Sequence, residues 1–449
     1  MSSPFALPHP VVWLSVGLLS MTAVVSPAAH AQDVPLTLAA AASAALETGP
    51  ALAAAKARRE GADADQMRAA AARLPSLQLD GSLTRFQEPM VVAPLHSFDP
   101  SRPPRFDETL VQGAARIRYT AFDGGARGAR LQGARSGVVA AEASVEARRM
   151  DVLQQVTAAY LDVLAARAQQ DAARRREEAL QAESERARRT VASGSAAELE
   201  ALRASAALEE ARADAATSGA RRELAERSLA RLIGRPADAV VGRPLTDVRL
   251  AESVGDPVRS GSHPELARAL EAVRAAEARV GEQRAARLPR LDVTAGLLDY
   301  GTATGGHTTE WQAGVAVTWP LFTGGARTAA VRRAEADAVA ARAEREAAAR
   351  SLEAATDEAR AAVTEADARA QALTASVAQW EEVTRIEALA LEAGAGVQSD
   401  LLMAEASLFR SRAGLARARY DRLLARVRLA RALGTLDRDW LGRTLEVDG

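Results

Sequence analysis

The hydrophobic and polar positions of the chain follow two different periods. Leu77, Leu79 and Leu83 alternate with polar residues, and this period of two gives a strand one apolar and one polar face. The same alternation occurs at three further places. The pattern therefore predicts four strands, which cover residues 76–86, 111–122, 290–300 and 311–322.

Each strand pair is followed by a much longer stretch with a helical period. These stretches begin after Gly125 and after Gly325 and continue for about 69 residues, which is on the order of 100 Å of helix. Small and β-branched residues recur along them at alternating steps of four and three, the spacing of coiled-coil packing. Glycine-containing breaks near 191–200 and 392–402 predict the tips of two helical hairpins, from which shorter helices return.

The chain contains an internal repeat, two copies of one structural unit. Arg73-Leu74-Pro75 recurs 214 positions later as Arg287-Leu288-Pro289, and the segment 122–127 recurs 200 positions later as 322–327. Offsets held over such distances indicate that both halves share one structure. The predicted domains are a first repeat at 32–234, an equatorial linker at 235–262, a second repeat at 263–434 and a C-terminal tail at 435–449, which we expect to lie beside the linker.

A shorter helix precedes each strand pair, at 50–74 and at 264–288. Each ends at a proline, which cannot continue a helix. The return helices are shorter than the outgoing helices by about 30 residues, each of which adds 1.5 Å to the length of a helix. We expect each short helix to make up this difference by stacking end to end with the return helix of the other unit.

The N-terminus predicts an exported protein. An apolar run from Val11 to Val25 precedes Ala29-His30-Ala31, a small-x-small cleavage pattern. We interpret residues 1–31 as a secretory signal peptide, with an uncleaved anchor helix as the alternative. The apolar run is shorter than the ~20 residues that a membrane-spanning helix needs.

Composition narrows the classes of function. The formal net charge is −1 and arginines alternate with acidic residues, so no basic field for a nucleic acid is expected. Cysteine is absent, and the histidines after the signal peptide have no metal-ligand spacing, so we expect no metal site and no cofactor. No nucleophile motif, phosphate loop or carboxylate pair stands out, and the protein is not expected to be an enzyme.

The strands have the features of a transmembrane β-barrel. They are about 10 residues long, the span of a tilted membrane strand, and Trp311 and Trp319 lie where interfacial anchors are found. The face opposite the apolar residues carries Arg116, Arg118 and Asp292, which we expect to line the barrel lumen. The alternative is a half-buried sheet on the core of a soluble protein.

Four strands cannot close a barrel, and unpaired strand edges in lipid cost several kcal/mol per group. Two copies would give eight strands with a filled interior, whereas three copies give twelve strands and a useful pore. The predicted fold is therefore an α+β membrane protein. It combines a long α-helical coiled-coil barrel with a transmembrane β-barrel of four strands per protomer, and it is trimeric.

Three motifs within this repeat resemble a known family. They are the strand-to-helix turns at Gly124-Gly125 and Gly324-Gly325 and the Gly-x-Gly-x-x-Ser-Asp-Leu-Leu break that begins at Gly394. Together with the repeat they resemble the outer membrane efflux proteins, the TolC-like channel-tunnels, over 36–434. The resemblance implies a homotrimer in the outer membrane of a Gram-negative bacterium, surrounded by outer-membrane lipid. It also implies a periplasmic tunnel that docks to a periplasmic adaptor (membrane fusion) protein and an inner-membrane transporter. The lipidated members carry a cysteine that this chain lacks.

The resemblance further implies a periplasmic gate where acidic side chains ring the pore at the hairpin tips. The matching positions are Asp400 and Glu200, each six residues after a glycine, with two more acids and three tip glycines nearby. The additional residues are Glu198, Glu405, Gly194, Gly394 and Gly396. Like charges in a narrow lumen favour cations and raise the pKa values of the acids. The alternative is helix capping by Ser195 and Ser399. Met403 departs from the family pattern, since some members carry a second acid there.

These observations predict the exit duct of a tripartite efflux pump for drugs, other small molecules or metal ions. An exit duct for type I protein secretion remains an alternative, because cargo choice in such systems lies in the inner-membrane component. An alternative of another class is a periplasmic coiled-coil adaptor or scaffold. That alternative leaves the two amphipathic strand pairs unexplained.

Overall fold

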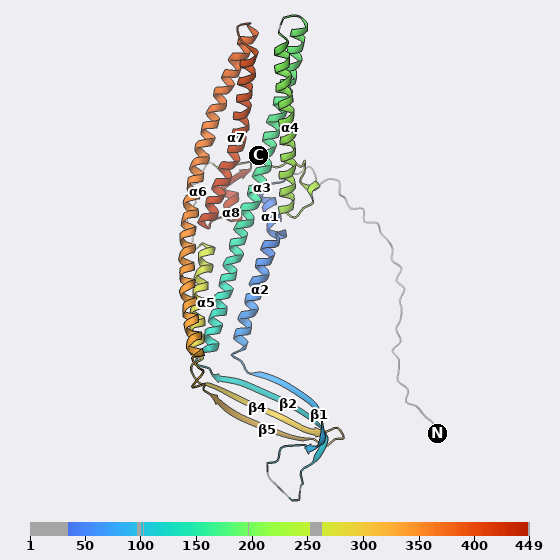
Figure 1. The fold of residues 1–449 in the computed structure, drawn as a ribbon, viewed down its shortest axis with the longest axis vertical. Helices are drawn as coiled ribbons and strands as arrows, with labels where there is room; N and C mark the ends of the chain where they lie inside the picture. Colours follow the sequence, from blue (N-terminus) through green and yellow to red (C-terminus); the bar gives the residue numbers. More distant parts are fainter. Residues whose placement is uncertain (1–34, 97–99, 102, 196, 252–262, 448–449) are drawn as a thin grey trace, which may run out of the picture.

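The computed structural model describes residues 35–447, except 97–99, 102, 196 and 252–262. Long helices run side by side and end on a small sheet that lies across their lower end (Figure 1). This arrangement confirms the predicted α+β organisation. The expected signal peptide, 1–31, lies outside the described residues.

The first repeat begins with a helix that the sequence pattern did not predict. This helix, α1, lies directly before the expected short helix and is separated from it by Gly49. The two expected strands extend further into their loop than expected, to Val91 and from Phe106. The elements are α1 (Leu38–Thr48), α2 (Pro50–Ala71), β1 (Ser76–Val91), β2 (Phe106–Phe122), α3 (Ala126–Ala192) and α4 (Glu198–Leu232).

The second repeat follows the same order. Its last strand ends at Thr318, before the expected end at 322, because Pro320 has no N–H to donate to a ladder. Its elements are α5 (Pro264–Ala285), β4 (Arg290–Thr302), β5 (Thr308–Thr318), α6 (Ala326–Glu392) and α7 (Gln398–Leu433).

The linker and the C-terminal tail meet near the middle of the helices. The linker contains η1 (Ala237–Ala239) and β3 (Val248–Leu250), and the tail contains α8 (Arg438–Thr444) and β6 (Leu445–Val447). β3 and β6 pair antiparallel, so the expected contact between tail and linker is present. The remainder of the linker, 252–262, lies outside the described residues.

The four long strands form one antiparallel sheet in the order β1-β2-β4-β5. In the first hairpin Leu77 lies opposite Ile117, and in the second Leu291 lies opposite Val317. Shifting the first pair by the repeat offsets of 214 and 200 positions gives the second pair. The two hairpins therefore have the same register, although the first has the longer loop.

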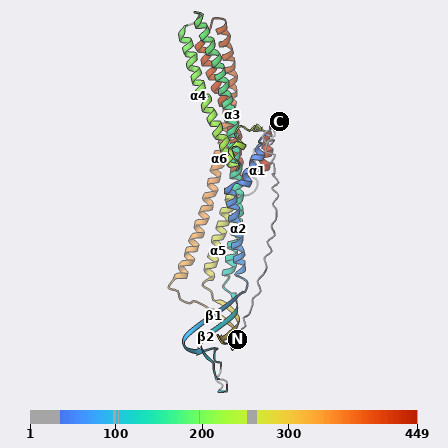
Figure 2. The ribbon, with the colours of Figure 1, turned by 90° about the vertical axis from the view of Figure 1, so that its right-hand side faces the viewer.

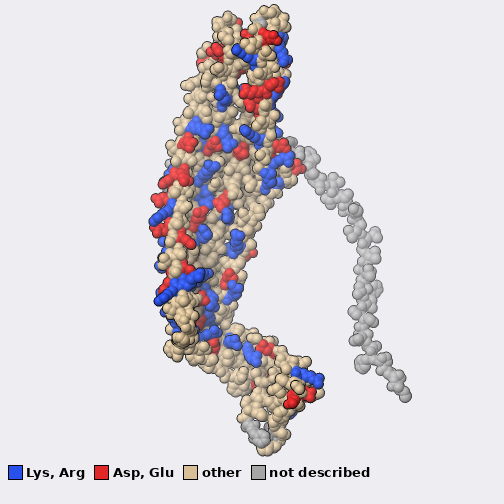
Figure 3. Space-filling view, in the orientation of Figure 1, with Lys and Arg blue, Asp and Glu red and all other residues tan. Residues whose placement is uncertain are grey.

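The long helices α3 and α6 each contain 67 residues, about 100 Å at 1.5 Å per residue. α3 packs against both short helices, α2 and α5, and against both return helices, α4 and α7 (Figures 1 and 2). Val156 and Val163 on α3 lie among the β-branched residues expected at the coiled-coil spacing, and both are fully buried. Arginine and acidic side chains are interspersed over the helical surface, whereas charges on the visible face of the sheet gather towards its ends (Figure 3).

We expected each short helix to stack end to end with the return helix of the other unit, and this prediction is wrong. The end of α4, at Gly234, lies against Thr48 at the end of α1, directly before α2. The end of α7, at Gly434, lies against His263 at the start of α5. Each return helix thus meets the short helix of its own repeat, because the outgoing helix of a unit supports both.

The main core lies where these helix ends meet the linker. The phenol of Tyr160, buried on α3, donates to the backbone oxygens of Leu36 and Thr246, each at 2.7 Å. Glu226 on α4 is also fully buried and accepts two bonds from the guanidinium of Arg167, at 2.6 and 2.8 Å. The bond to Thr246 fixes the linker to the middle of α3, and the bonds to Glu226 join α3 to α4.

Among the described residues, no single helix combines the length and hydropathy of a membrane span; α1 and α2 do so only when taken together, with a 47° bend between them.

Candidate functional site

Both hairpin tips lie at the end of the molecule opposite the sheet (Figure 1). Each tip contains a glycine in the left-handed region, with φ of 77° at Gly194 and 72° at Gly394. An L side chain at either position would be strained. Gly396 is required for space, because a Cβ there would lie 2.8 Å from the backbone nitrogen of Leu391. The three glycines therefore shape the two turns, in two different ways.

The acidic residues expected at the tip lie in the first turns of the return helices. Glu198 and Glu200 are in the first turn of α4, and Asp400 is in the first turn of α7. Glu198 and Asp400 are exposed, and Glu200 is partly exposed. Acidic side chains are favoured at these positions by the helix dipole, and their exposure leaves them free to face a lumen or solvent.

Serine capping of the return helices was the alternative for this region, and the structure does not show it for α4 or α7. The N-cap of α4 is Ala197 and that of α7 is Val397, and neither forms a side-chain cap. Ser399 lies within the first turn of α7, where its hydroxyl donates to Asp400 at 3.3 Å. Ser195 precedes the N-cap of α4 by two positions.

Glu405 is not in the tip turns but more than one helical turn further along α7. Its carboxyl is partly buried beside α3. Burial and the negative charge of Glu183 raise the pKa of Glu405 above its ordinary value, although Arg186 and Arg176 counteract this. The carboxyl thus favours its neutral form more than an ordinary glutamate does.

Two residues that sequence reasoning missed join the hairpins near the tip. The amide of Gln398 on α7 donates to the carboxylate of Glu183 on α3, at 2.6 Å. Gln398 is 8% exposed and the Glu183 side chain 12%, so water competes little for this bond. Nearby, the guanidinium of Arg176 on α3 lies 5.1 Å from the ring of Phe409 on α7, a cation–π contact. No local sequence signal marks Glu183 among the many acids of α3.

The four strand-to-helix turn glycines all have positive φ, and each pair directly precedes a long helix. The values are 67° at Gly124, 93° at Gly125, 58° at Gly324 and 85° at Gly325. Before the first pair, Asp123 accepts bonds from the backbone N–H of Gly125 at 3.1 Å and of Arg127 at 3.0 Å. Partial burial raises the pKa of Asp123, but the bonds from Arg127 and Gly125 outweigh it and lower the pKa below its ordinary value. The turn fixes where α3 leaves the sheet.

The three residues expected in the barrel lumen share one face of the sheet. Arg116 on β2 pairs with Asp80 on β1 at 2.5 Å. Asp292 on β4 accepts a bond from the hydroxyl of Thr120 at 2.6 Å and pairs with Arg290 at 2.9 Å. Arg118 projects from the same face, two positions from Arg116 along β2. The sequence pattern had identified the face but not the partners: Asp80 and Thr120 come from neighbouring strands, and Arg290 comes from the same strand as Asp292.

The opposite face of the sheet is apolar and exposed. Leu79 on β1 is 77% exposed and Trp311 on β5 is 78% exposed. Other large apolar residues on this face are also exposed, among them Leu77, Leu83, Ile117, Leu297, Val315 and Val317. An exposed apolar surface of this extent indicates contact with lipid or with another protein.

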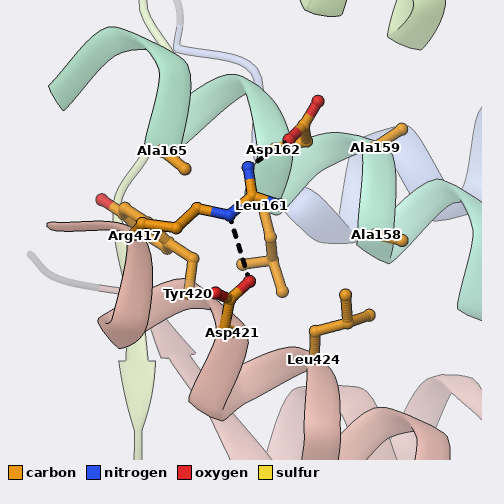
Figure 4. Close-up of a pocket in the computed structure, with 9 residues that line it drawn as sticks. All are labelled: Ala158, Ala159, Leu161, Asp162, Ala165, Arg417, Tyr420, Asp421 and Leu424. Atoms are coloured by element: carbon orange, nitrogen blue, oxygen red, sulfur yellow. Dashed lines mark hydrogen bonds and ion pairs between the residues drawn. The ribbon is translucent and has the colours of Figure 1, made fainter. Parts of the chain in front are cut away.

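A groove of about 300 Å³ lies between α3 and α7 near mid-length (Figure 4). Alanines form much of its wall, and Arg417 spans it, with Asp162 at 2.8 Å and Asp421 at 3.2 Å. About half of each of these side chains is exposed, so the ion pairs contribute little to stability. Over the part of the chain that the structure describes, no group of three or more histidine and acidic side chains is arranged to hold a metal ion.

Comparisons with known proteins agree with this architecture. A family model described as "Outer membrane efflux protein" matches residues 41–235 and 260–435. No curated protein matches the chain by sequence.

Several solved structures share the fold. The outer membrane protein VceC of Vibrio cholerae is 22% identical, with a TM-score of 0.74, over 88% of this chain and 96% of its own. The CmeC outer membrane channel of Campylobacter jejuni is 19% identical, with a TM-score of 0.78, over 90% and 87%. The MtrE outer membrane channel of Neisseria gonorrhoeae, solved in an open state, is 23% identical, with a TM-score of 0.72, over 89% and 90%.

Proposed function

Because this chain belongs to the outer membrane efflux protein family, we propose that it forms the exit duct of a tripartite efflux pump. The protein resides in the outer membrane and extends its helices into the periplasm. The proposed cargo is a small molecule, such as a drug, or a metal ion. The proposed partners are a periplasmic adaptor protein and an inner-membrane transporter.

One observation carries this proposal: the two helices of about 100 Å, α3 and α6, each follow directly on a sheet with an exposed apolar face. A rod of this length suits a tunnel that crosses the periplasm. The apolar face of the sheet suits outer-membrane lipid, and its opposite face carries arginine and acidic side chains suited to a water-filled lumen. Three copies would supply the twelve strands of a closed barrel, with Arg116, Arg118 and Asp292 inside.

We further propose that the hairpin tips form the periplasmic gate. Asp400, Glu198 and Glu200 carry exposed or partly exposed carboxylates beside tight glycine turns. In a trimer these acids would surround a narrow opening and favour cations. Glu405 would act from behind the tip, where α3 and α7 meet.

Membrane fractionation tests the duct. We expect trimers in the outer-membrane fraction that dissociate on heating, and ion-conducting pores in planar bilayers. Recovery as a soluble periplasmic monomer would support an adaptor or scaffold and refute the duct.

Deletion of the gene in its own host tests the cargo. Greater accumulation of a fluorescent dye and greater drug or metal sensitivity are expected for a small-molecule duct. Unchanged accumulation with loss of a secreted protein would support type I protein secretion in its place.

A further inference from the structure

The two outer strands of the sheet, β1 and β5, each have one edge without a neighbouring strand among the described residues. We propose that β5 pairs with β1 of the partner subunit in one defined register. Val317 lies opposite Gly81 of the partner subunit, and Val315 lies opposite Leu83 of the partner subunit. The inference rests on the proposed barrel and adds the register of its subunit contact.

The edges need a partner because the apolar face continues up to them. Val315 and Val317 on β5 are 66% and 68% exposed, and Leu79 on β1 is 77% exposed. Strand edges in a lipid environment leave N–H and C=O groups unpaired, which is too unfavourable to persist. A further copy of the chain offers the complementary edge, since the strand that follows β5 around a closed barrel is β1.

The repeat supplies the register. The hairpin pair Leu83 and Val111, shifted by 214 and 200 positions, becomes Leu297 and Trp311, which are paired in the structure. Applying the two offsets to one observed pair therefore gives another observed pair in the same register. The same conversion applies to the contact between repeats.

Within one chain, the first repeat meets the second along β2 and β4. Ile117 lies opposite Ala295 there, and Ala115 lies opposite Leu297. In a closed barrel the second repeat meets the first repeat of the next copy along β5 and β1. Adding 200 to the β2 positions and subtracting 214 from the β4 positions gives the two pairs proposed above.

The faces agree with this register. Val317 and Val315 meet partner positions that share the apolar face with Leu79, so the lipid-facing surface continues across the seam. A slip of one residue would bring the polar face of one strand against the apolar face of the other. A slip of two residues would preserve the faces but displace the strands by about 6.6 Å.

The same conversion predicts a helix contact between copies that a slip of two residues would break. Between the repeats of one chain, Gly281 on α5 lies against Ala129 on α3, where an added Cβ would be 3.5 Å from the alanine Cβ. The repeat offsets convert this contact into Met67 of the partner subunit against Ala329. Met67 is 65% exposed in the single chain, and this contact would cover it. A strand slip would carry α2 away from α6 by the same distance.

The partner subunit also completes the polar face. The same conversion of the Arg118–Thr294 pair places Thr318 opposite Asp80 of the partner subunit. On the polar face, Thr318 on β5 thus has Arg290 of its own chain on one side and an acidic side chain of the next copy on the other. The lumen surface of each protomer is incomplete without its neighbour.

Disulfide cross-linking tests the register, because the chain has no cysteine of its own. The test variants are Gly81→Cys with Val317→Cys on the apolar face and Ser82→Cys with Ala316→Cys on the polar face. Paired strand positions have Cα atoms within reach of a disulfide. We expect copper-phenanthroline oxidation in membranes to give covalent dimers and trimers that a reductant removes.

Two kinds of control accompany these variants. Leu79→Cys with Val317→Cys represents the slip of two residues, at a Cα separation of about 8 Å, beyond disulfide reach. It should cross-link at least about tenfold more slowly than the proposed pairs. Ile117→Cys with Ala295→Cys is the equivalent pair within one chain and should oxidise without forming a covalent oligomer.

The outcomes separate the register from the barrel. Faster cross-linking of the displaced pair than of the proposed pairs overturns the register. The register is also overturned if heat-dissociable trimers form and the pair within one chain oxidises, but neither proposed pair cross-links. A protein that is monomeric and outside the membrane, with no cross-links between copies, refutes the proposed duct itself.

Discussion

The bond between Gln398 and Glu183 allows a quantitative test of the gate. Gln398→Ala removes an amide that donates to a carboxylate at 2.6 Å between α7 and α3. A hydrogen bond to a charged group contributes roughly 1.5–3 kcal/mol, and the burial of both side chains places this bond in the upper part of that range. If the bond exists only while the hairpins are together, the opening equilibrium at each tip shifts by roughly 50- to 150-fold.

Single-channel recording in planar bilayers measures this shift. We expect Gln398→Ala trimers to show a higher open probability than the parent protein at the same pH and salt concentration. Gln181→Ala is the matched control, because Gln181 on α3 makes only an exposed contact of 3.5 Å with Glu185 of the same helix. An open probability that is unchanged in Gln398→Ala, or raised equally in both variants, would refute the reasoning.

Three further predictions concern single acids. Asp400→Ala should weaken block of the pore by multivalent cations, measured in bilayers, because it removes an exposed carboxylate from each tip. Open probability should fall as the pH decreases from neutral towards about 4.5. Burial and Glu183 raise the pKa of Glu405, and protonation of this carboxyl removes its repulsion between α7 and α3. Glu405→Gln should abolish this pH dependence. Glu226→Ala should destabilise the protein by about 3–5 kcal/mol, measured by thermal or denaturant unfolding, since it leaves the Arg167 guanidinium without its buried partner.

Each of these predictions has its own counter-result. A blocking constant that is the same with and without Asp400 would reduce that residue to a favourable charge at a helix end. Pore opening that increases in acid would reverse the sign assigned to Glu405. Glu223→Ala, one turn before Glu226 and half exposed, should change stability little, and an equal loss in both variants would contradict the importance of burial.

The periodic elements could be predicted from the sequence because each has its own repeating pattern. The alternation at Leu77, Leu79 and Leu83 identified β1, and the glycine break at Gly394 located the second tip. α1 was missed although Gly49-Pro50 marks its end, because its short, alanine-rich sequence contains too few polar residues to show a helical period. The strand ends were underestimated at Val91, where the alternation weakens before the chain leaves the sheet.

Contacts between distant segments were harder to predict. The offsets established two copies but did not determine which short helix meets which return helix, and the prediction was wrong. That choice depends on packing around α3, visible only where Gly234 meets Thr48. The bond between Glu183 and Gln398 joins residues far apart in the sequence, and α3 contains many acids that a linear pattern does not distinguish.

The shared register of the hairpins has a geometric consequence for the pore. Across the sheet, Asp80 lies opposite Ala114, which lies opposite Leu298, the counterpart of Thr84 in the first repeat. From one repeat to the next, the residues that lie opposite one another are thus displaced by four positions. This displacement is about 13 Å along the strands for about 10 Å across two strands, and it corresponds to a strand tilt of about 54° from the barrel axis. Six such repeats would give a circumference of about 100 Å and a diameter of roughly 30 Å between backbones, wide enough to leave an open bore after the inward side chains are placed.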